Sequence, residues 1–410
     1  MCRKKRQTRV TALSDTRFRR FFPVICMSTI AGWILRFLLG LSAWELTHSS
    51  AWVGIVVFVL LAPTFLLTPY FGIQADRINP RRGMQLAMLF NMLIAVFASL
   101  AAQLGLYTIW TVVVLALFSG AVVAMQVPMR LALVPLLVPR DLLASAVGLS
   151  SVVFNSTRIL GPALAAALVL TWSTSAVWLL AALFFGLAAV LLYGLKEVGV
   201  RPPPLKESLF SQFRAGLHYA ASQPAIKLLF GFAFLNGMLG RTAMELLPAI
   251  SGQLLHGEAA ELAVLSSSAG AGSILAGFMV SRLRDQHDVL LRLIVSSLLA
   301  VATLHLSVRW ASETAGLAIF IGLMSFGTTI VGTVGQILAQ LVVADEYRGR
   351  VMSLWSILIL GIPALSALAV GTLAEQFGFA SVWLLLGAIG WVLTLVFYAR
   401  RTVFAEPPRP

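Results

Sequence analysis

Long apolar runs, separated by short polar stretches, occupy most of the 410-residue chain. A helix needs about 20 predominantly apolar residues to cross the hydrocarbon core of a bilayer. None of the runs has the short alternating pattern that is typical of a transmembrane β-barrel strand. We therefore predict an all-α membrane protein. Its twelve spanning helices should cover residues 21–47, 51–73, 84–104, 108–134, 143–169, 176–195, 226–250, 261–281, 289–308, 315–338, 351–374 and 379–399.

The runs repeat at half the length of the chain. Four residues of the first half reappear at an offset of 205: Gly32, Arg36, Gly72 and Arg77 correspond to Gly237, Arg241, Gly277 and Arg282. Because six spans per half is an even number, the two halves should share one orientation, related by an axis along the membrane normal. Duplicated membrane bundles are mostly transporters, with the substrate site between the halves.

Composition and charge placement support this topology. Hydrophobic residues make up 59% of the chain and charged residues only 11%, whereas a soluble domain carries about a quarter charged residues. The net charge is +14, and 25 of the 30 basic residues fall in the termini and loops that the spans place on one side of the membrane. Positive charge marks the cytoplasmic side. We therefore expect both termini in the cytoplasm, a lipid bilayer as the surroundings, and no nucleic-acid partner.

One polar stretch divides the chain near its middle. Three consecutive prolines, Pro202–Pro204, end the sixth span, and apolar residues then recur at helical spacing, which predicts an amphipathic helix on the cytoplasmic surface. No loop is long enough for a nucleotide-binding domain, so pumping must draw on an ion gradient. The expected organisation is a basic tail (1–20), a six-helix bundle (21–195), a linker (196–225), a second bundle (226–399) and a short tail (400–410).

A charged string follows the second span. It reads GIQADRINPRRG, and its candidate gating residues are Gly72, Asp76, Arg77, Arg81 and Arg82. Asp76 among arginines can form charge-assisted hydrogen bonds at helix ends, which would hold two helices together in one state and release them in another. The alternative is a positive-inside anchor with one incidental aspartate.

This string resembles the G-x-x-x-D-R-x-x-R-R signature of the major facilitator superfamily. The segment 155–166 resembles the Gly-Pro motif of the superfamily's antiporters and supplies three further gating candidates, Arg158, Gly161 and Pro162. The segments 126–149 and 345–357 resemble the branch that contains the enterobactin exporter, macrolide-efflux proteins and transmembrane secretion effectors. The second of these contributes Arg348 and Arg350 to the candidate gate.

The resemblance covers nearly the whole chain. It implies two six-helix bundles, a bacterial inner-membrane location, a monomer without cofactors, and export of a small molecule in exchange for protons. One departure concerns the repeated gate, because Ser281 precedes Arg282 where the first half has Asp76 before Arg77. A strictly symmetric gating mechanism is therefore not expected.

Several charged residues fall inside the predicted spans. Ionisable groups in a membrane cost several kcal/mol and by default indicate function. The candidates for substrate or proton coupling are Arg36, Glu45, Arg130, Arg241 and Glu245. Glu245 lies one helical turn from Arg241, on the same face, and is the best candidate to carry a proton. The alternatives are snorkelling or a static ion pair, which we favour for Arg158 near the cytoplasmic face and leave open for Arg130 and Glu45.

No pattern indicates catalysis or metal binding. The sequence contains no HExxH or CxxC spacing, and no Ser-His-Asp set can be assembled from it. We therefore predict neither an enzyme nor a metal site.

The function predicted from the sequence is proton-coupled export of a small amphipathic molecule, such as a drug or siderophore, by alternating access. Spans 1, 4, 7 and 10 should line the central site, with Trp33, Phe37 and Phe234 in its apolar walls. Two alternatives remain, a lipid or lysolipid flippase of the same fold and a membrane sensor or scaffold that does not transport.

Overall fold

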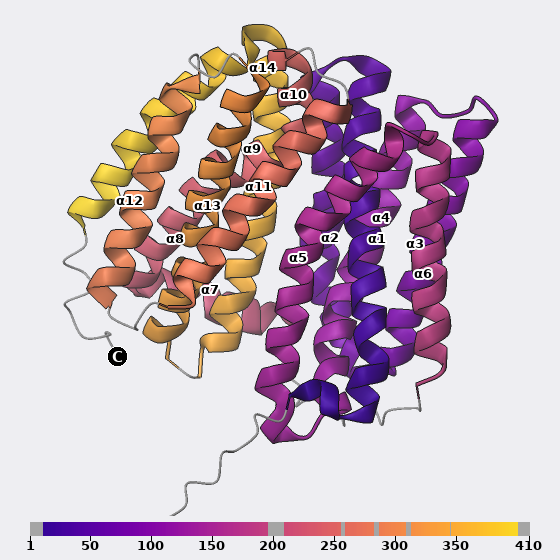
Figure 1. The fold of residues 1–410 in the computed structure, drawn as a ribbon. Coiled ribbons are helices and arrows are strands. Elements are labelled where there is room, and N and C mark those ends of the chain that lie inside the picture. Colours follow the sequence, from indigo (N-terminus) through magenta and orange to yellow (C-terminus); the bar gives the residue numbers. More distant parts are fainter. Residues whose placement is uncertain are drawn as a thin grey trace, which may run out of the picture.

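The structure, a computed structural model, describes residues 11–195, 209–255, 259–282, 287–308, 313–344 and 346–400. Within these residues the chain forms helices and turns and no strands, as the sequence predicts. Figure 1 shows two bundles side by side, one of indigo to magenta helices and one of rose to yellow helices.

The first bundle contains six long helices, most of which begin at a side chain that caps their free amide groups. Asp15 accepts hydrogen bonds from the amides of Arg17 and Phe18, and Ser49 and Asn79 cap the next two helices in the same way. The helices are α1 (Thr16–Thr47), α2 (Ser50–Arg77), α3 (Pro80–Gln103), α4 (Ile109–Leu137), α5 (Leu143–Val169) and α6 (Thr174–Tyr193). Short 3-10 helices, η1 (Ala12–Ser14) and η2 (Arg140–Leu142), precede α1 and α5.

The second bundle repeats this plan with one interrupted crossing. The interrupted crossing comprises α8 (Pro224–Asn236), the π-helical turn η3 (Gly237–Arg241), α9 (Thr242–Glu245) and α10 (Leu247–Leu255). The remaining helices are α11 (Ala259–Val280), α12 (His287–Leu306), α13 (Thr314–Val342) and α14 (Arg348–Ala399). The last of these turns back on itself at Gly378, whose φ of 74° and ψ of 150° are not helical, so α14 crosses the bundle twice.

Within the described ranges, ten helices are long and apolar enough to span a membrane. Counting the two arms of α14 separately and the interrupted segment α8–α10 as one crossing gives the twelve crossings that the sequence predicts. The fold class is therefore confirmed as an all-α membrane protein. The start of α1 lies at the bottom of Figure 1, and the second arm of α14 runs from the top of the picture down its left side.

Glycines allow the closest helix crossings inside each bundle. A Cβ on Gly120 of α4 would lie 2.2 Å from the carbonyl oxygen of Leu60 in α2. A Cβ on Gly272 of α11 would lie 2.0 Å from the carbonyl oxygen of Gly322 in α13. In the repeat, α2 and α4 correspond to α11 and α13, so both bundles use the same helix crossing. The glycine lies on the second helix of the pair in the first bundle and on the first helix in the second bundle. Small residues commonly allow such close packing between membrane helices.

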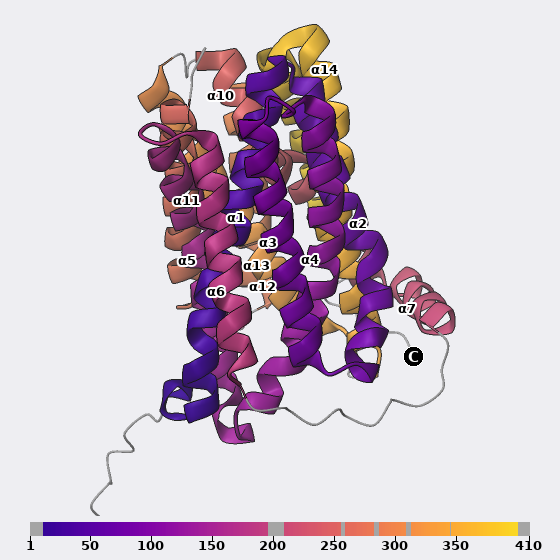
Figure 2. The same cartoon turned by 90° about the vertical axis from the view of Figure 1, so that its right-hand side faces the viewer.

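The two bundles meet along α2 with α14 and along α5 with α11. At the end where α2 begins, the Glu375 carboxylate of α14 accepts hydrogen bonds from Ser50 N (2.7 Å) and Ser50 Oγ (3.0 Å). Gln253 of α10 donates to Ser50 Oγ (3.4 Å) and to the Ala374 carbonyl (3.3 Å). A carboxylate is favourable at a helix N-terminus, so these bonds join the halves at this end, near the top of Figure 2.

A separate helix, α7 (Leu209–Ser222), lies beside the second bundle at the end opposite the Ser50–Glu375 contacts (Figure 2). Tyr219 stacks on Tyr347 with ring centroids 4.1 Å apart, and Gly216 packs against Arg350. The preceding residues 196–208 of the expected linker, and most of the two expected tails, lie outside the described residues.

The glycine crossing predicts a specific loss of stability. Gly272→Ala should lower the free energy of unfolding by about 1–3 kcal/mol, because the new methyl group must push α11 and α13 apart. Gly277→Ala, on the same helix, is the control, since a Cβ there meets no atom within 4 Å. Thermal unfolding of the detergent-solubilised protein would measure both. Equal melting temperatures for the two variants would contradict the packing argument.

Candidate functional site

A cavity of about 360 Å³ lies between the bundles. Its walls come from α1, α2, α4 and α5 of the first bundle and from α9, α10, α11 and α14 of the second, with single residues from α3, α6 and η3. The lining is mostly apolar. It contains five charged residues: Arg36, Arg130, Arg158, Arg241 and Glu245.

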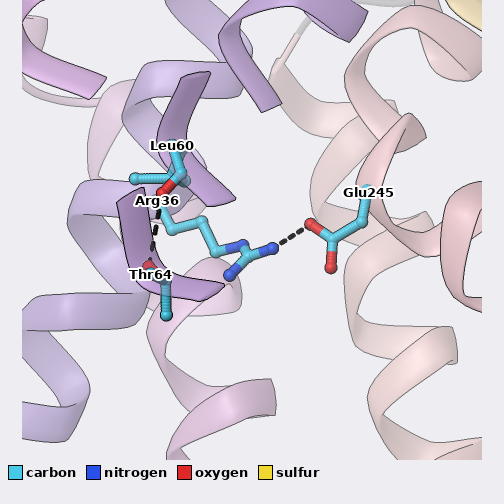
Figure 3. A network of polar contacts seen from close by, with 4 residues as sticks. All are labelled: Arg36, Leu60, Thr64 and Glu245. Carbon is cyan, nitrogen blue, oxygen red and sulfur yellow. Dashed lines mark hydrogen bonds and ion pairs between the residues drawn. The ribbon is translucent and has the colours of Figure 1, made fainter. Parts of the chain in front are cut away.

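An ion pair between two lining residues joins the bundles across the cavity. Nη2 of Arg36, on α1, donates to Oε2 of Glu245, on α9, and so links the first bundle to the second (Figure 3). The side chains are 28% and 16% exposed, which leaves both reachable from the cavity while removing most of their hydration. Since opposite charges attract more strongly where water is scarce, this pair is a substantial link between the halves.

Arg241 is held by the π-helical turn rather than by regular helix. Thr242 Oγ1, at the start of α9, donates to the carbonyl of Gly237 (2.8 Å), the first residue of this turn. A Cβ on Gly240 would lie 2.0 Å from Thr328 Oγ1 of α13, so glycine is needed for this turn to pack there. Single π-helical turns often occur at functional sites. Arg241 and Glu245 both line the cavity, as their spacing predicts, but Glu245 forms its hydrogen bond with Arg36 of the other bundle.

Arg158 lies in the cavity, which corrects the interpretation that it snorkels near the cytoplasmic face. Its guanidinium lies 6.0 Å from the ring centroid of Trp33, and that of Arg36 lies 5.7 Å from the same ring. Arg158 and Arg241 line the same cavity as the Glu245 carboxylate. A Cβ on Gly161 would lie 2.5 Å from the Cβ of Trp33, so Gly161 permits the close contact of α5 with α1.

The aromatic wall continues to Arg130. Phe154 lies 5.7 Å from Trp33 between ring centroids, and the Arg130 guanidinium lies 5.6 Å from the Phe154 centroid. Guanidinium groups favour positions over aromatic faces. Three arginines from α1, α4 and α5 therefore border one continuous aromatic surface.

Other expected positions lie away from the cavity. Glu45 is exposed near the end of α1. Phe234 is 41% exposed and does not line the cavity, whereas Trp33 and Phe37 do. The expectation that spans 1, 4, 7 and 10 form the site is wrong for span 10, because α13 contributes no lining residue. Its place is taken by α2, α5, α11 and α14.

The proposed gating residues are scattered. Arg81 is buried and donates to the carbonyls of Leu192 (2.9 Å) and Tyr193 (2.7 Å), so it caps the end of α6 within the first bundle. Arg82 and Arg282 are exposed, and Arg282 lies 4.0 Å from the Phe278 ring centroid. Gly72 has open space around it, Pro162 lines the cavity, and Arg350 lies over Tyr347. The side chains of Asp76, Arg77 and Arg348 fall outside the described part of the chain.

Two elements of the site are not apparent from the sequence. Phe154 is one of 25 phenylalanines, and only the fold brings it between Trp33 and Arg130. Glu375 lies 325 residues from Ser50 in the sequence and directly follows the predicted span 351–374, so no local signal indicates its contact with Ser50. Among the described side chains, no group of histidine, cysteine, aspartate or glutamate could hold a metal ion.

Comparisons with known proteins show the family to which the chain belongs. The family model described as "Transmembrane secretion effector" matches residues 8–405. The staphyloferrin A transporter of Staphylococcus aureus is 23% identical over 92% of this chain and 94% of its own length. Macrolide efflux protein A of Enterococcus faecalis is 24% identical over 73% of this chain and 94% of its own length.

Solved structures share the fold. A bacterial homologue of the human lysosomal transporter Spinster, in an inward-facing and unoccupied conformation, superposes with a TM-score of 0.75 at 12% identity, covering 96% of this chain and 99% of that one. The nucleoside transporter NupG gives a TM-score of 0.71 at 13% identity, with 95% and 100% covered.

The ion pair across the cavity predicts energetic coupling between two bundles. Arg36→Gln and Glu245→Gln should each destabilise the protein, because each removes the ion pair that joins the bundles, and Glu245→Gln also leaves Arg36 without its carboxylate partner. The double variant should be more stable than the sum of the two losses predicts, with a coupling energy of about 0.5–3 kcal/mol. Thermal unfolding of the four proteins in nanodiscs gives this cycle. Strictly additive losses would mean that the two side chains do not interact.

Proposed function

Because the chain belongs to the transmembrane secretion effector family of major facilitator transporters, we propose that it is a proton-coupled exporter of a small amphipathic organic molecule. The substrate occupies the cavity between the bundles, and Glu245 carries the proton. The main support is the position of Glu245, which is the one carboxylate among the described lining residues and is bonded to the opposite bundle.

A proton on Glu245 and a substrate at Arg36 would act on the same bond. Protonation removes the charge that attracts Arg36, and a substrate group that pairs with Arg36 takes the place of Glu245. Either event frees the two bundles to move relative to each other, whereas the empty cavity with its ion pair stays locked. A carrier that changes orientation only when loaded exchanges its two ligands, which is the behaviour of an antiporter.

The end sealed by Ser50, Gln253 and Glu375 is proposed to face outward. Most loop and tail arginines and lysines belong to the segments that the predicted spans assign to the opposite side, which the positive-inside rule places in the cytoplasm. On this orientation both termini are cytoplasmic, the membrane is the bacterial inner membrane, and the structure is the inward-facing form, which is ready to take up substrate from the cell interior.

Relatives support the substrate class in general terms. One carries staphyloferrin A by its name, and another is named for macrolide efflux. The cavity of this chain combines apolar walls with a few charged groups, which suits amphipathic organic molecules of this kind.

Proteoliposomes with an imposed pH gradient test the proposal. A screen of small organic compounds should find one whose movement is driven by the gradient, with matching proton movement reported by a lumenal pH dye. Glu245→Gln should reduce the gradient-driven movement to background, because the amide cannot release a proton.

Glu45→Gln is the matched control, since Glu45 is exposed near the end of α1 and outside the cavity. It should leave gradient-driven transport unchanged. Full proton-coupled transport by Glu245→Gln would exclude Glu245 as the proton carrier.

A further inference from the structure

The charge of the cavity is unbalanced. Its lining contains four arginines and one glutamate, and among the residues that the structure describes only Arg36 has a carboxylate partner. Arginine stays protonated in proteins, and an unmatched charge in a membrane interior costs several kcal/mol. The polar neutral residues of the lining, such as Thr64, Asn91 and Gln126, cannot supply the missing negative charge.

We propose that the substrate of this cavity is an amphipathic organic anion whose carboxylate binds Arg158 and Arg36 beside Trp33. This rests on the proposed transport function and specifies its substrate class. Carboxylates match the planar N–H edge of guanidinium, which can bind both oxygens at once. A cationic substrate would instead meet four arginines.

The aromatic surface explains how the arginines are held without an anion. Arg36 and Arg158 share the Trp33 ring at 5.7 and 6.0 Å, and Arg130 lies 5.6 Å from Phe154. Contact with a ring face stabilises a guanidinium through the flat side of the group. Among the described residues no group accepts a hydrogen bond from Arg158, and Arg36 uses only Nη2 for its bond to Glu245, so N–H groups of both arginines remain for a ligand. The aromatic rings and the apolar lining would in turn contact the body of the ligand.

Exchange with a proton remains possible for an anion. When the anion pairs with Arg36, Glu245 loses that partner, but Arg241 lies one helical turn away and lines the same cavity. Glu245 can therefore keep its charge while the anion is bound. The proton-loaded and anion-loaded forms are then separate states of one arginine cluster.

Three matched compounds test the sign of the substrate charge. They are 1-naphthoate, 1-naphthylmethanol and 1-naphthylmethylammonium, which share an aromatic body and differ in charge. Titration calorimetry with the protein in nanodiscs of zwitterionic lipid should detect binding of the carboxylate and at least about tenfold weaker binding of the alcohol and the ammonium. Stronger binding of the ammonium, equal binding of all three, or no binding of the carboxylate would overturn the proposal.

Variants locate the site. Arg158→Gln should weaken carboxylate binding by about tenfold or more, because it removes a charge-assisted pair. Arg282→Gln, an exposed arginine outside the cavity, should bind the carboxylate as the unaltered protein does. Unchanged binding by Arg158→Gln would overturn the assignment. Calorimetry detects binding without transport. If the protein binds the anion but moves no compound in proteoliposomes, the exporter proposal is refuted and the anion site is not.

An anionic lipid headgroup is the other source of the same chemistry. Repeating the titration in nanodiscs that contain phosphatidylglycerol distinguishes the two. If the lipid competes, phosphatidylglycerol should weaken carboxylate binding to the unaltered protein but should not weaken it further in Arg158→Gln. That result would identify the natural anion as a lipid headgroup. If the affinity does not change, the anion is a free organic acid. Both results support an anionic ligand at Arg158.

Discussion

The Arg36–Glu245 ion pair is the interaction on which the account of this protein depends. It is a bond between two bundles that are otherwise held by helix packing and by the Ser50–Glu375 contacts at one end. It lies in a cavity where charges are poorly hydrated, so its formation and loss carry a large free-energy difference. A proton can neutralise Glu245, and a ligand can displace it from Arg36. Because Glu245 also joins the two bundles, either event changes how the bundles are held together.

The surrounding fold supports this pair from both sides. On the first bundle, Gly161 lets α5 approach α1, which places Arg158 and Arg36 on the same tryptophan ring. On the second, the π-helical turn and Gly240 set the position of Arg241 next to Glu245. The repeated glycines serve different purposes, because Gly32 lines the cavity while Gly237 packs against Ile362 of α14. The duplication thus provides a common frame, and the coupling residues arise from its asymmetry.

The sequence predicts the fold well because membrane helices are specified by simple physical quantities. Run length fixes the number of crossings, and the offset of 205 residues pairs Gly32 with Gly237 and Arg36 with Arg241. The site is only partly predictable. Glu245 and Arg241 could be found because ionisable groups in apolar runs are rare. The choice of Arg36 as the partner of Glu245, the inward position of Arg158, and the role of Phe154 depend on how α1, α5 and α9 approach one another, which local spacing does not contain.

The central claim is that the ionised Arg36–Glu245 pair stabilises the form in which the Ser50–Glu375 end is closed. Pulsed electron spin resonance between labels at positions 148 on α5 and 277 on α11 measures it, since both sites have open space and lie toward the opposite end. The labels would be placed in a background with Cys2 and Cys26 changed to serine. The account predicts that Glu245→Gln shortens the distances between the labels, because the end of the molecule opposite the Ser50–Glu375 contacts closes when the ion pair is lost. Identical distance distributions with and without the substitution would contradict it.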